Sequence, residues 1–163
     1  MLKAEYDSGW ICLDFPALPA EECPIPSGLA EALGCKPVEV HRNQFPAYLA
    51  ELDSERTVQM LQPDLAQLGK SGCDRCIVTA RGDSGSHDFV SRFFAPGIGI
   101  DEDPVTGSAH CTLGPYWAKR LAKTELVGYQ ASKRGGIVKV RVRGDRVTLL
   151  GQAVTVMRGE IIR

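Results

Sequence analysis

Residues 138–143 alternate between apolar and charged positions. Val138, Val140 and Val142 fall on one side of this pattern, and the residues between them are basic. A period of two is typical of a half-buried β-strand. Gly144-Asp145 is a turn signal, so the sequence predicts that this strand folds back onto a second one over 146–150.

The longest helical pattern covers residues 106–121. Leu113, Trp117 and Leu121 recur every four residues and share one stripe of a helix. So much apolar bulk needs a surface to cover it, and we expect the helix to be central with all three side chains buried. Gly114-Pro115 is expected to weaken or kink its middle.

Shorter patterns predict further strands and helices. Ser27 is a candidate N-cap of a short helix that Gly34 ends in the left-handed conformation. Asp53 or Ser54 can start a second helix, which Pro63 divides. The predicted strands cover 9–15, 45–52, 76–80 and 87–95, the helices 27–33 and 54–68, and a hairpin 152–157 with 160–163; after residues 126–132 the chain is expected to be all β. These elements predict one α+β domain over 1–163, with antiparallel strands around one dominant helix.

Composition and charge limit the partners. The chain has 163 residues, of which 44% are hydrophobic, and its formal net charge is -1. A near-neutral chain has no electrostatic reason to bind a phosphate backbone. No apolar run approaches the roughly 20 residues that span a bilayer. We therefore expect a cytoplasmic protein that binds neither nucleic acid nor membrane.

The six cysteines do not form a metal-binding pattern. Cys73 and Cys76 make the single C-x-x-C pair, and the three histidines supply no second pair at the spacing of a zinc site. The strand-like residues after Cys76 also disfavour a redox motif, which needs a helix start there. Ordinary reduced thiols are the favoured interpretation and a zinc or redox role is the alternative; we expect no metal.

The segment from Arg92 to His110 carries the most chemical information. A strand leads into a glycine-containing acidic loop and then into the long helix through Thr106-Gly107-Ser108. The first N–H groups of a helix lack internal partners and attract anions. Gly107 permits close approach to the backbone, and Ser108 adds a hydroxyl donor. The pattern predicts a site for a carboxylate-bearing small molecule.

Asp103 lies just before these amides and has two interpretations. An Asp ahead of Pro is a common helix-start signal, which favours a capping role. A carboxylate beside an anion site can also accept or return a proton. Both roles are compatible, because a capping Asp that faces a cleft is still a site residue. His110, one turn into the helix, is interpreted as a packed histidine rather than a base.

Several separated motifs resemble the PhzF-like family of phenazine-biosynthesis-type isomerases. They are Arg92-Phe-Phe-Ala-Pro, Glu102-Asp-Pro-Val-Thr-Gly-Ser-Ala-His110, Tyr116-Trp117, Gln130-Ala-Ser-Lys-Arg-Gly-Gly136 and Val147–Gly159. The resemblance implies a diaminopimelate epimerase-like fold, in which two similar lobes each wrap a β-roll around a central helix. It also implies isomerisation without a cofactor, by proton transfer next to a carboxylate.

The same resemblance implies roles for four residues. The Asp-Pro-x-Thr-Gly-Ser motif of the family falls on Asp103, Thr106, Gly107 and Ser108. Asp103 would be a catalytic and substrate-binding residue, and the other three would bind substrate.

The match covers the C-terminal lobe, and residues 1–15 resemble the end of an N-terminal lobe that is otherwise missing. We therefore expect either an isomerase or epimerase half-protein that needs a second lobe, a noncatalytic carboxylate-binding module, or an inactive truncated member. Two copies could cover the surface that the second lobe would occupy, so a homodimer is expected.

Overall fold

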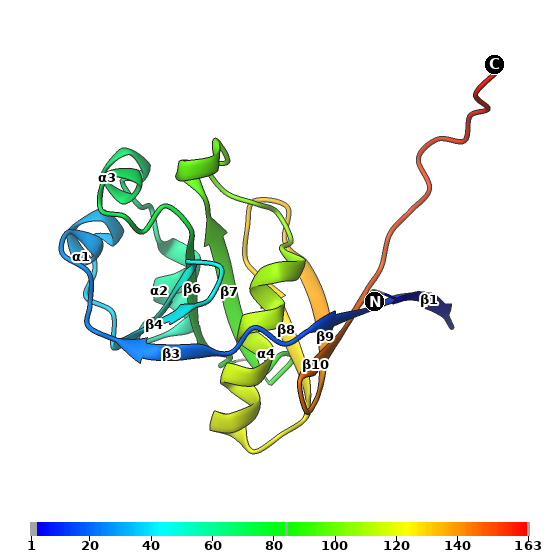
Figure 1. The fold of residues 1–163 in the computed structure, drawn as a ribbon, viewed down its shortest axis with the longest axis horizontal. Coiled ribbons are helices and arrows are strands. Elements are labelled where there is room, and N and C mark those ends of the chain that lie inside the picture. Colours follow the sequence, from blue (N-terminus) through cyan, green and yellow to red (C-terminus); the bar gives the residue numbers. More distant parts are fainter. Residues whose placement is uncertain (1–2, 84, 163) are drawn as a thin grey trace.

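Ten strands form one mixed sheet in the protein, which we describe from a computed structural model over residues 3–83 and 85–162 (Figure 1). The order across the sheet is β1-β2-β10-β9-β8-β7-β6-β5-β4-β3. The strands are β1 (Lys3–Asp7), β2 (Trp10–Pro16), β3 (Ala20–Cys23), β4 (Glu39–Asn43), β5 (Tyr48–Glu51), β6 (Cys76–Arg81), β7 (Phe89–Phe94), β8 (Glu125–Gln130), β9 (Gly136–Arg143) and β10 (Arg146–Gly151).

Two strand junctions are parallel, so the expectation of a purely antiparallel sheet is wrong there. β5 pairs in parallel with β6, and β7 with β8. In both cases the chain passes through helix before the next strand, and such a crossover brings the second strand back in the same direction. The helices are α1 (Leu29–Leu33), α2 (Glu55–Met60), α3 (Leu65–Lys70) and α4 (Gly107–Leu121), with a 3-10 turn η1 (Pro96–Ile98).

The sheet curls around α4. The α4 residue Thr112 accepts a hydrogen bond from Asn43 of β4, while Gly114 lies against Val140 of β9 and Val147 of β10. Six strand spacings separate β4 from β10, which is about 29 Å in a flat sheet, whereas a helix is about 10–12 Å across. One helix can touch both regions only if the sheet bends over it. The predicted central helix and α+β architecture are confirmed.

Two apolar clusters fill the two sides of the sheet. The cluster on the α4 side contains Leu113, Trp117 and buried side chains from β5 to β10. The other cluster packs α1, α2 and α3 against the opposite side of the sheet. Leu113 and Trp117 are buried as predicted, but Leu121 is only half-buried because it occupies the last turn of α4.

α4 is continuous through Gly114-Pro115, where the sequence suggested a kink. A Cβ atom at position 114 would lie 2.9 Å from Cγ1 of Val140 and 3.3 Å from Cγ2 of Val142. Glycine therefore permits α4 to lie close against β9. The close packing of Gly114 against β9 offsets the poor helix propensity of Gly114-Pro115.

Charged groups hold the second half of α4 against β4 and β5. The Tyr116 hydroxyl lies 2.6 Å from Glu39 Oε1 and 2.5 Å from Glu51 Oε2. The Arg120 guanidinium pairs with both carboxylates and lies over the Tyr116 ring. These contacts fix the helix along its length, and hence the direction in which its first turn points.

Helix boundaries agree in part with the sequence signals. Ser54 Oγ accepts from Thr57 N, and the predicted second helix is divided near Pro63 into α2 and α3. Gly34 ends α1 with φ 69°, as expected. The Ser27 cap is wrong, because the N-cap residue is Gly28 with φ 82°.

The predicted C-terminal hairpin is wrong over the described residues. Positions 152–162 form no strand and extend away from the sheet (Figure 1), and Arg163 lies outside the described residues. Both edges of β10 are already paired, with β2 and with β9, so the continuing chain has no free edge beside it. Its apolar side chains are 84–93% exposed, namely Val154, Val156, Met157, Ile161 and Ile162.

The sequence analysis did not predict three short strands. β1, β3 and β4 lack a clean apolar alternation, and every residue of β1 is exposed. The strand expected over 45–52 begins at Tyr48, since Phe45 belongs to a turn. All six cysteines are free thiols; Cys73, Cys76 and Cys111 are buried, and Cys12, Cys23 and Cys35 are half-buried. Within the described residues, no helix is long and apolar enough to cross a membrane.

We predict that Trp117→Ala lowers the free energy of unfolding by about 3–5 kcal/mol, because it opens a large cavity in the core. Trp117 is 2% exposed, its ring stacks on Phe89, and its indole N–H donates to Thr79 Oγ1 at 3.0 Å. Trp10→Ala is the control, since Trp10 is only half-buried, at the start of β2. Denaturant unfolding measures both, and equal effects would contradict this account of the core.

Candidate functional site

The start of α4 presents backbone N–H groups without internal acceptors. The helix begins at Gly107, one residue after the expected start, and the N-cap residue is Thr106, whose side chain makes no capping hydrogen bond. Gly107 and Ser108 follow and are both exposed, while His110 N is the first amide to bond back, to the Thr106 carbonyl at 3.3 Å. Among the described residues no acceptor meets the amides of Gly107 or Ser108. This is the geometry of an anion site.

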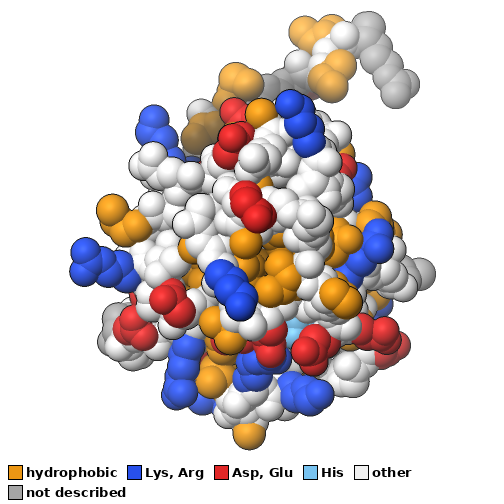
Figure 2. Space-filling view, turned by 90° about the vertical axis from the view of Figure 1, so that its left-hand side faces the viewer, with side chains coloured by type: hydrophobic (Ala, Val, Ile, Leu, Met, Phe, Trp, Pro, Cys, Tyr) orange, Lys and Arg blue, Asp and Glu red, His pale blue; other side chains and the backbone are white. Residues whose placement is uncertain are grey.

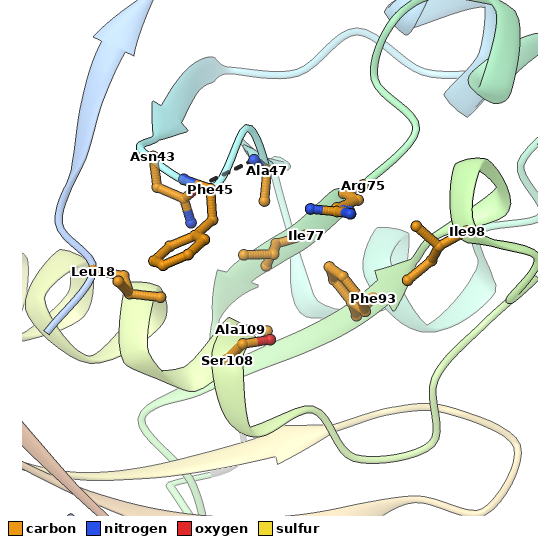
Figure 3. Close-up of a pocket in the computed structure, with 10 residues that line it drawn as sticks. All are labelled: Leu18, Asn43, Phe45, Ala47, Arg75, Ile77, Phe93, Ile98, Ser108 and Ala109. Carbon is orange, nitrogen blue, oxygen red and sulfur yellow. Dashed lines mark hydrogen bonds between the residues drawn. The ribbon is translucent and has the colours of Figure 1, made fainter. Parts of the chain in front are cut away.

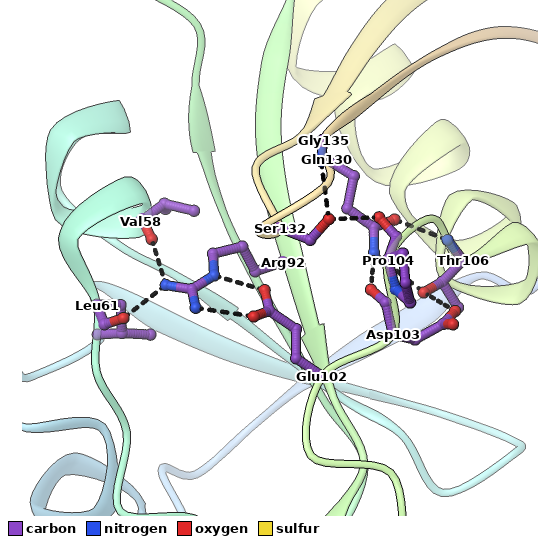
Figure 4. Close-up of polar contacts among 10 residues, drawn as sticks. All are labelled: Val58, Leu61, Arg92, Glu102, Asp103, Pro104, Thr106, Gln130, Ser132 and Gly135. Carbon is purple, nitrogen blue, oxygen red and sulfur yellow. Dashed lines mark hydrogen bonds and ion pairs between the residues drawn. The ribbon is translucent and has the colours of Figure 1, made fainter.

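The Thr106 hydroxyl does not bind the helix amides, because it is hydrogen-bonded to Asp103. Thr106 Oγ1 donates to Asp103 Oδ2 at 2.5 Å, so the hydroxyl points back into the loop (Figure 4). The capping interpretation of Asp103 is therefore wrong in its simple form, because its carboxylate binds the hydroxyl and not the amides. Pro104 lies outside the helix. Asp103 remains half-buried and next to the helix start.

Gln130 from the end of β8 clamps this segment. Its Oε1 accepts from Thr106 N at 2.8 Å, and its Nε2 donates to the Asp103 carbonyl at 2.7 Å and to Thr106 Oγ1 at 3.1 Å. Since the Thr106 oxygen accepts from Gln130, its own proton is directed to Asp103. Ser132 adds a bond from its hydroxyl to the Pro104 carbonyl at 2.7 Å.

Arg92 neutralises part of the acidic loop. Its Nε and Nη2 donate to the two carboxylate oxygens of Glu102, at 2.7 and 3.1 Å, and its Nη1 donates to the Leu61 carbonyl at 2.5 Å (Figure 4). A bidentate pair of this kind fixes orientation as well as charge. The loop is thus tied to the end of α2, and one of its three acidic charges is compensated.

A cavity of about 280 Å³ opens beside the first turn of α4 (Figure 3). Ser108 and Ala109 line it on the helix side. The rest of the lining is mostly apolar and consists of Leu18, Asn43, Phe45, Ala47, Arg75, Ile77, Phe93 and Ile98. Asn43 shapes the turn above the cavity, because its Oδ1 accepts from the amides of Phe45 and Ala47. A small ligand held at the helix start can place its body there.

His110 is buried beneath the site. Its side chain is fully enclosed, and Nδ1 lies 2.7 Å from the Thr106 carbonyl oxygen. A carbonyl only accepts, so Nδ1 carries the proton; Nε2 has no hydrogen-bond partner among the described residues. Burial lowers the pKa of His110 to about 4, so the ring is neutral near pH 7. The expectation of a packed histidine is confirmed.

The structure brings all four expected site residues together at one helix start, and it adds residues whose roles the sequence did not reveal. Three of these added residues lie inside the motifs that resemble the family, namely Arg92, Gln130 and Ser132. Their place in a motif was the one sign in the sequence that they belong to the site. Phe45 and Arg75 carried no such signal, because they reach the cavity from a turn and from the segment before β6. Within the described residues, no group of three or more His, Cys, Asp or Glu side chains could hold a metal ion.

Comparison with known proteins identifies the family to which this site and fold belong. The family model for phenazine biosynthesis-like proteins, PhzC-PhzF, matches residues 14–159. The chain belongs to this family. It is 48% identical over 163 residues to an uncharacterised isomerase of Halalkalibacterium halodurans, covering 99% of this chain and 61% of that protein. An uncharacterised isomerase of Pseudomonas aeruginosa is 46% identical over 160 residues, with 98% and 60% covered.

Solved structures of the family have the same fold. A PhzF-family protein of Enterococcus faecalis superposes with a TM-score of 0.89 at 40% identity, over 98% of this chain and 60% of that one. A PhzC/PhzF protein of Clostridium difficile gives 0.87 at 35% identity, over 99% and 61%. The chain thus spans about three fifths of the length of the relatives it matches.

We predict that His110 makes the protein acid-labile. Its pKa falls from about 6.5 in the unfolded chain to about 4 in the folded protein, so the unfolded chain binds one more proton between these values. Stability is then retained above pH 6.5 and falls by about 1.4 kcal/mol per pH unit towards pH 4. Denaturant unfolding of wild type and His110→Gln at pH 7, 5.5 and 4.5 measures the difference in slope. Parallel pH profiles would contradict the assignment.

Proposed function

We propose that the chain provides the carboxylate-binding half of a PhzF-type isomerase. The observation that carries the proposal is the uncapped start of α4, with free amides at Gly107 and Ser108 beside an apolar cavity and Asp103. Relatives described as isomerases support the reaction class. The substrate is then a small molecule whose carboxylate sits at the helix start and whose body occupies the cavity.

Binding is a balance between local donors and the surrounding charge. Two oriented amides, the helix dipole and the Ser108 hydroxyl attract an anion within the first turn. Asp101 and Asp103 oppose it, while Glu102 is compensated by Arg92. The donors act at contact distance and the acidic groups are screened by solvent over longer distances. Weak but specific carboxylate binding follows.

The proposed chemistry is proton transfer without a cofactor. A base removes a proton from a carbon near the substrate carboxylate, the charge moves into the conjugated system, and a proton returns to another carbon, so that no atom is gained or lost. Asp103 is the accessible titratable group beside the helix start, and Thr106 and Gln130 fix its position. His110 is neutral and buried, and takes no part in this step.

The proposal assigns residues 1–163 to one lobe of a diaminopimelate epimerase-like arrangement. A second lobe, provided by a longer chain or by a partner, would cover the site and supply a second acid–base group. Without it, Asp103 is the carboxylate that contacts the N-cap residue Thr106, and no second acid–base group of a different kind is exposed beside it in the described residues. That observation favours a second candidate function for the isolated chain, which is carboxylate binding without turnover.

We predict that Ser108→Ala lowers the affinity for a small carboxylate such as benzoate by about tenfold, because a hydrogen bond to a charged group is lost. Gly107→Val should lower it further by covering the amides. A Cβ at position 107 lies 3.7 Å from its nearest neighbour, Leu149 Cδ1, so steric conflict with the fold is small. Calorimetric titration measures both, with exposed Ser8→Ala as control. Unchanged affinity in both site variants would remove the helix start from the proposal.

We also propose that the isolated chain forms a homodimer in which a second copy takes the place of the second lobe. The segment 152–162 carries exposed apolar side chains. On the other side of the molecule, hydrophobic side chains gather near the centre of the face shown in Figure 2. Exposed apolar surface of this kind is most often covered by a two-fold copy.

Sedimentation at micromolar concentration is expected to show a dimer, which Val154→Asp with Val156→Asp weakens because the charges oppose burial. Ser8→Ala serves again as the neutral control. A stable wild-type monomer would refute the dimer. Deuterium incorporation into a carboxylate substrate should be slow or absent, since such a dimer adds a second Asp103 and no different acid–base group.

A further inference from the structure

The cavity beside α4 contains one charged side chain, that of Arg75. The other nine lining residues carry no charge. Arg75 belongs to the segment before β6, where its backbone carbonyl accepts from Tyr48 N. Figure 3 shows Arg75 and Ser108 on opposite sides of the cavity. In that view Ile77 and Phe93 lie between these two residues. A guanidinium stays protonated at every physiological pH.

Arg75 has no electrostatic partner in the part of the chain that the structure describes. No carboxylate lies within ion-pair distance of its guanidinium, and no carbonyl accepts from it. The one other polar side chain on that side, Asn43, is already used, because its amide donates to Thr112 and its oxygen accepts from two backbone amides. Arg75 is therefore the donor without a partner on the side of the cavity away from Ser108.

The lining between Arg75 and Ser108 favours a flat apolar ligand body. Phe45, Ile77, Phe93 and Ile98 present aromatic and branched surfaces around a cavity of about 280 Å³, a size that suits a compact ligand. A guanidinium recognises a carboxylate through two parallel N–H bonds, which fixes both distance and direction. The helix start holds one carboxylate, and Arg75 is suited to hold a second.

We propose that Arg75 is a specificity-determining residue for a compact dicarboxylic acid with an apolar, ring-like body. One acidic group binds the amides of Gly107 and Ser108, and the other binds the Arg75 guanidinium across the cavity. This inference rests on the proposed function of the helix start and deepens it by naming the substrate class.

Benzoate and the three isomeric benzenedicarboxylates are suitable probes, because they share one ring and differ in the number and spacing of carboxylates. Calorimetric titration of the wild-type chain should show at least one dicarboxylate binding about tenfold or more tightly than benzoate. Arg75→Met should abolish this preference by weakening dicarboxylate binding about tenfold more than benzoate binding, so that the ratio of the two affinities falls to about one. Arg75→Lys should retain part of it, since charge remains but the bidentate geometry is lost.

Arg56→Met is the matched control, because Arg56 is an exposed arginine of α2 away from the cavity lining. It removes the same charge and should keep the preference, while thermal unfolding confirms that the variants are folded. Equal binding of benzoate and all three dicarboxylates, or a preference that survives Arg75→Met, would overturn the role of Arg75. If benzoate binding is also insensitive to Ser108→Ala, or no probe binds, the helix-start proposal fails as well.

Discussion

The enclosure of α4 by the curled sheet is the constraint on which the rest of the structure depends. Trp117 fills the space between the helix and the strands, and Gly114 brings α4 close to β9. The second half of the helix is held by Tyr116 and Arg120 against carboxylates of β4 and β5. A helix fixed on so many sides cannot change its direction without opening the core. Its first turn is therefore held in place by contacts that lie far from the ligand site.

This rigidity allows the first turn to remain open. A threonine at the N-cap usually binds the amides of the following turn, but here Thr106 donates to Asp103 while Gln130 holds its amide. The stability lost by leaving two N–H groups free is of the order of 1 kcal/mol, which is small beside the burial of Trp117 alone. Packing thus holds the binding groups in place, and burial in the core offsets the stability that the uncapped helix start loses.

The sequence predicts the parts of this architecture that depend on local pattern. The stripe through Leu113 and Trp117, the valine alternation of β9 and the motif from Asp103 to Ser108 each reflect interactions within a few residues. The errors fall where partners are distant. No local signal shows that Thr106 turns towards Asp103, that Gln130 reaches back across 24 residues, or that Phe45 leaves its strand to line a cavity. The hairpin expected after β10 is wrong over the described residues, because a local turn signal does not show whether the two arms would have a surface to pack against.

The position of β2 in the sheet has a consequence for how the chain reaches its fold. β2 pairs with β10, so that Asp14 lies opposite Thr148, and Arg146 bonds back to Asp14 across 132 positions. The parallel junctions likewise require whole crossovers to form before their strands can pair. Non-local pairing of this kind raises contact order, and domains with high contact order fold in milliseconds to seconds rather than microseconds. β9 and β10, which enclose α4 on one side, follow it in the chain, so during synthesis the residues of the site-bearing helix leave the ribosome before the strands that cover it.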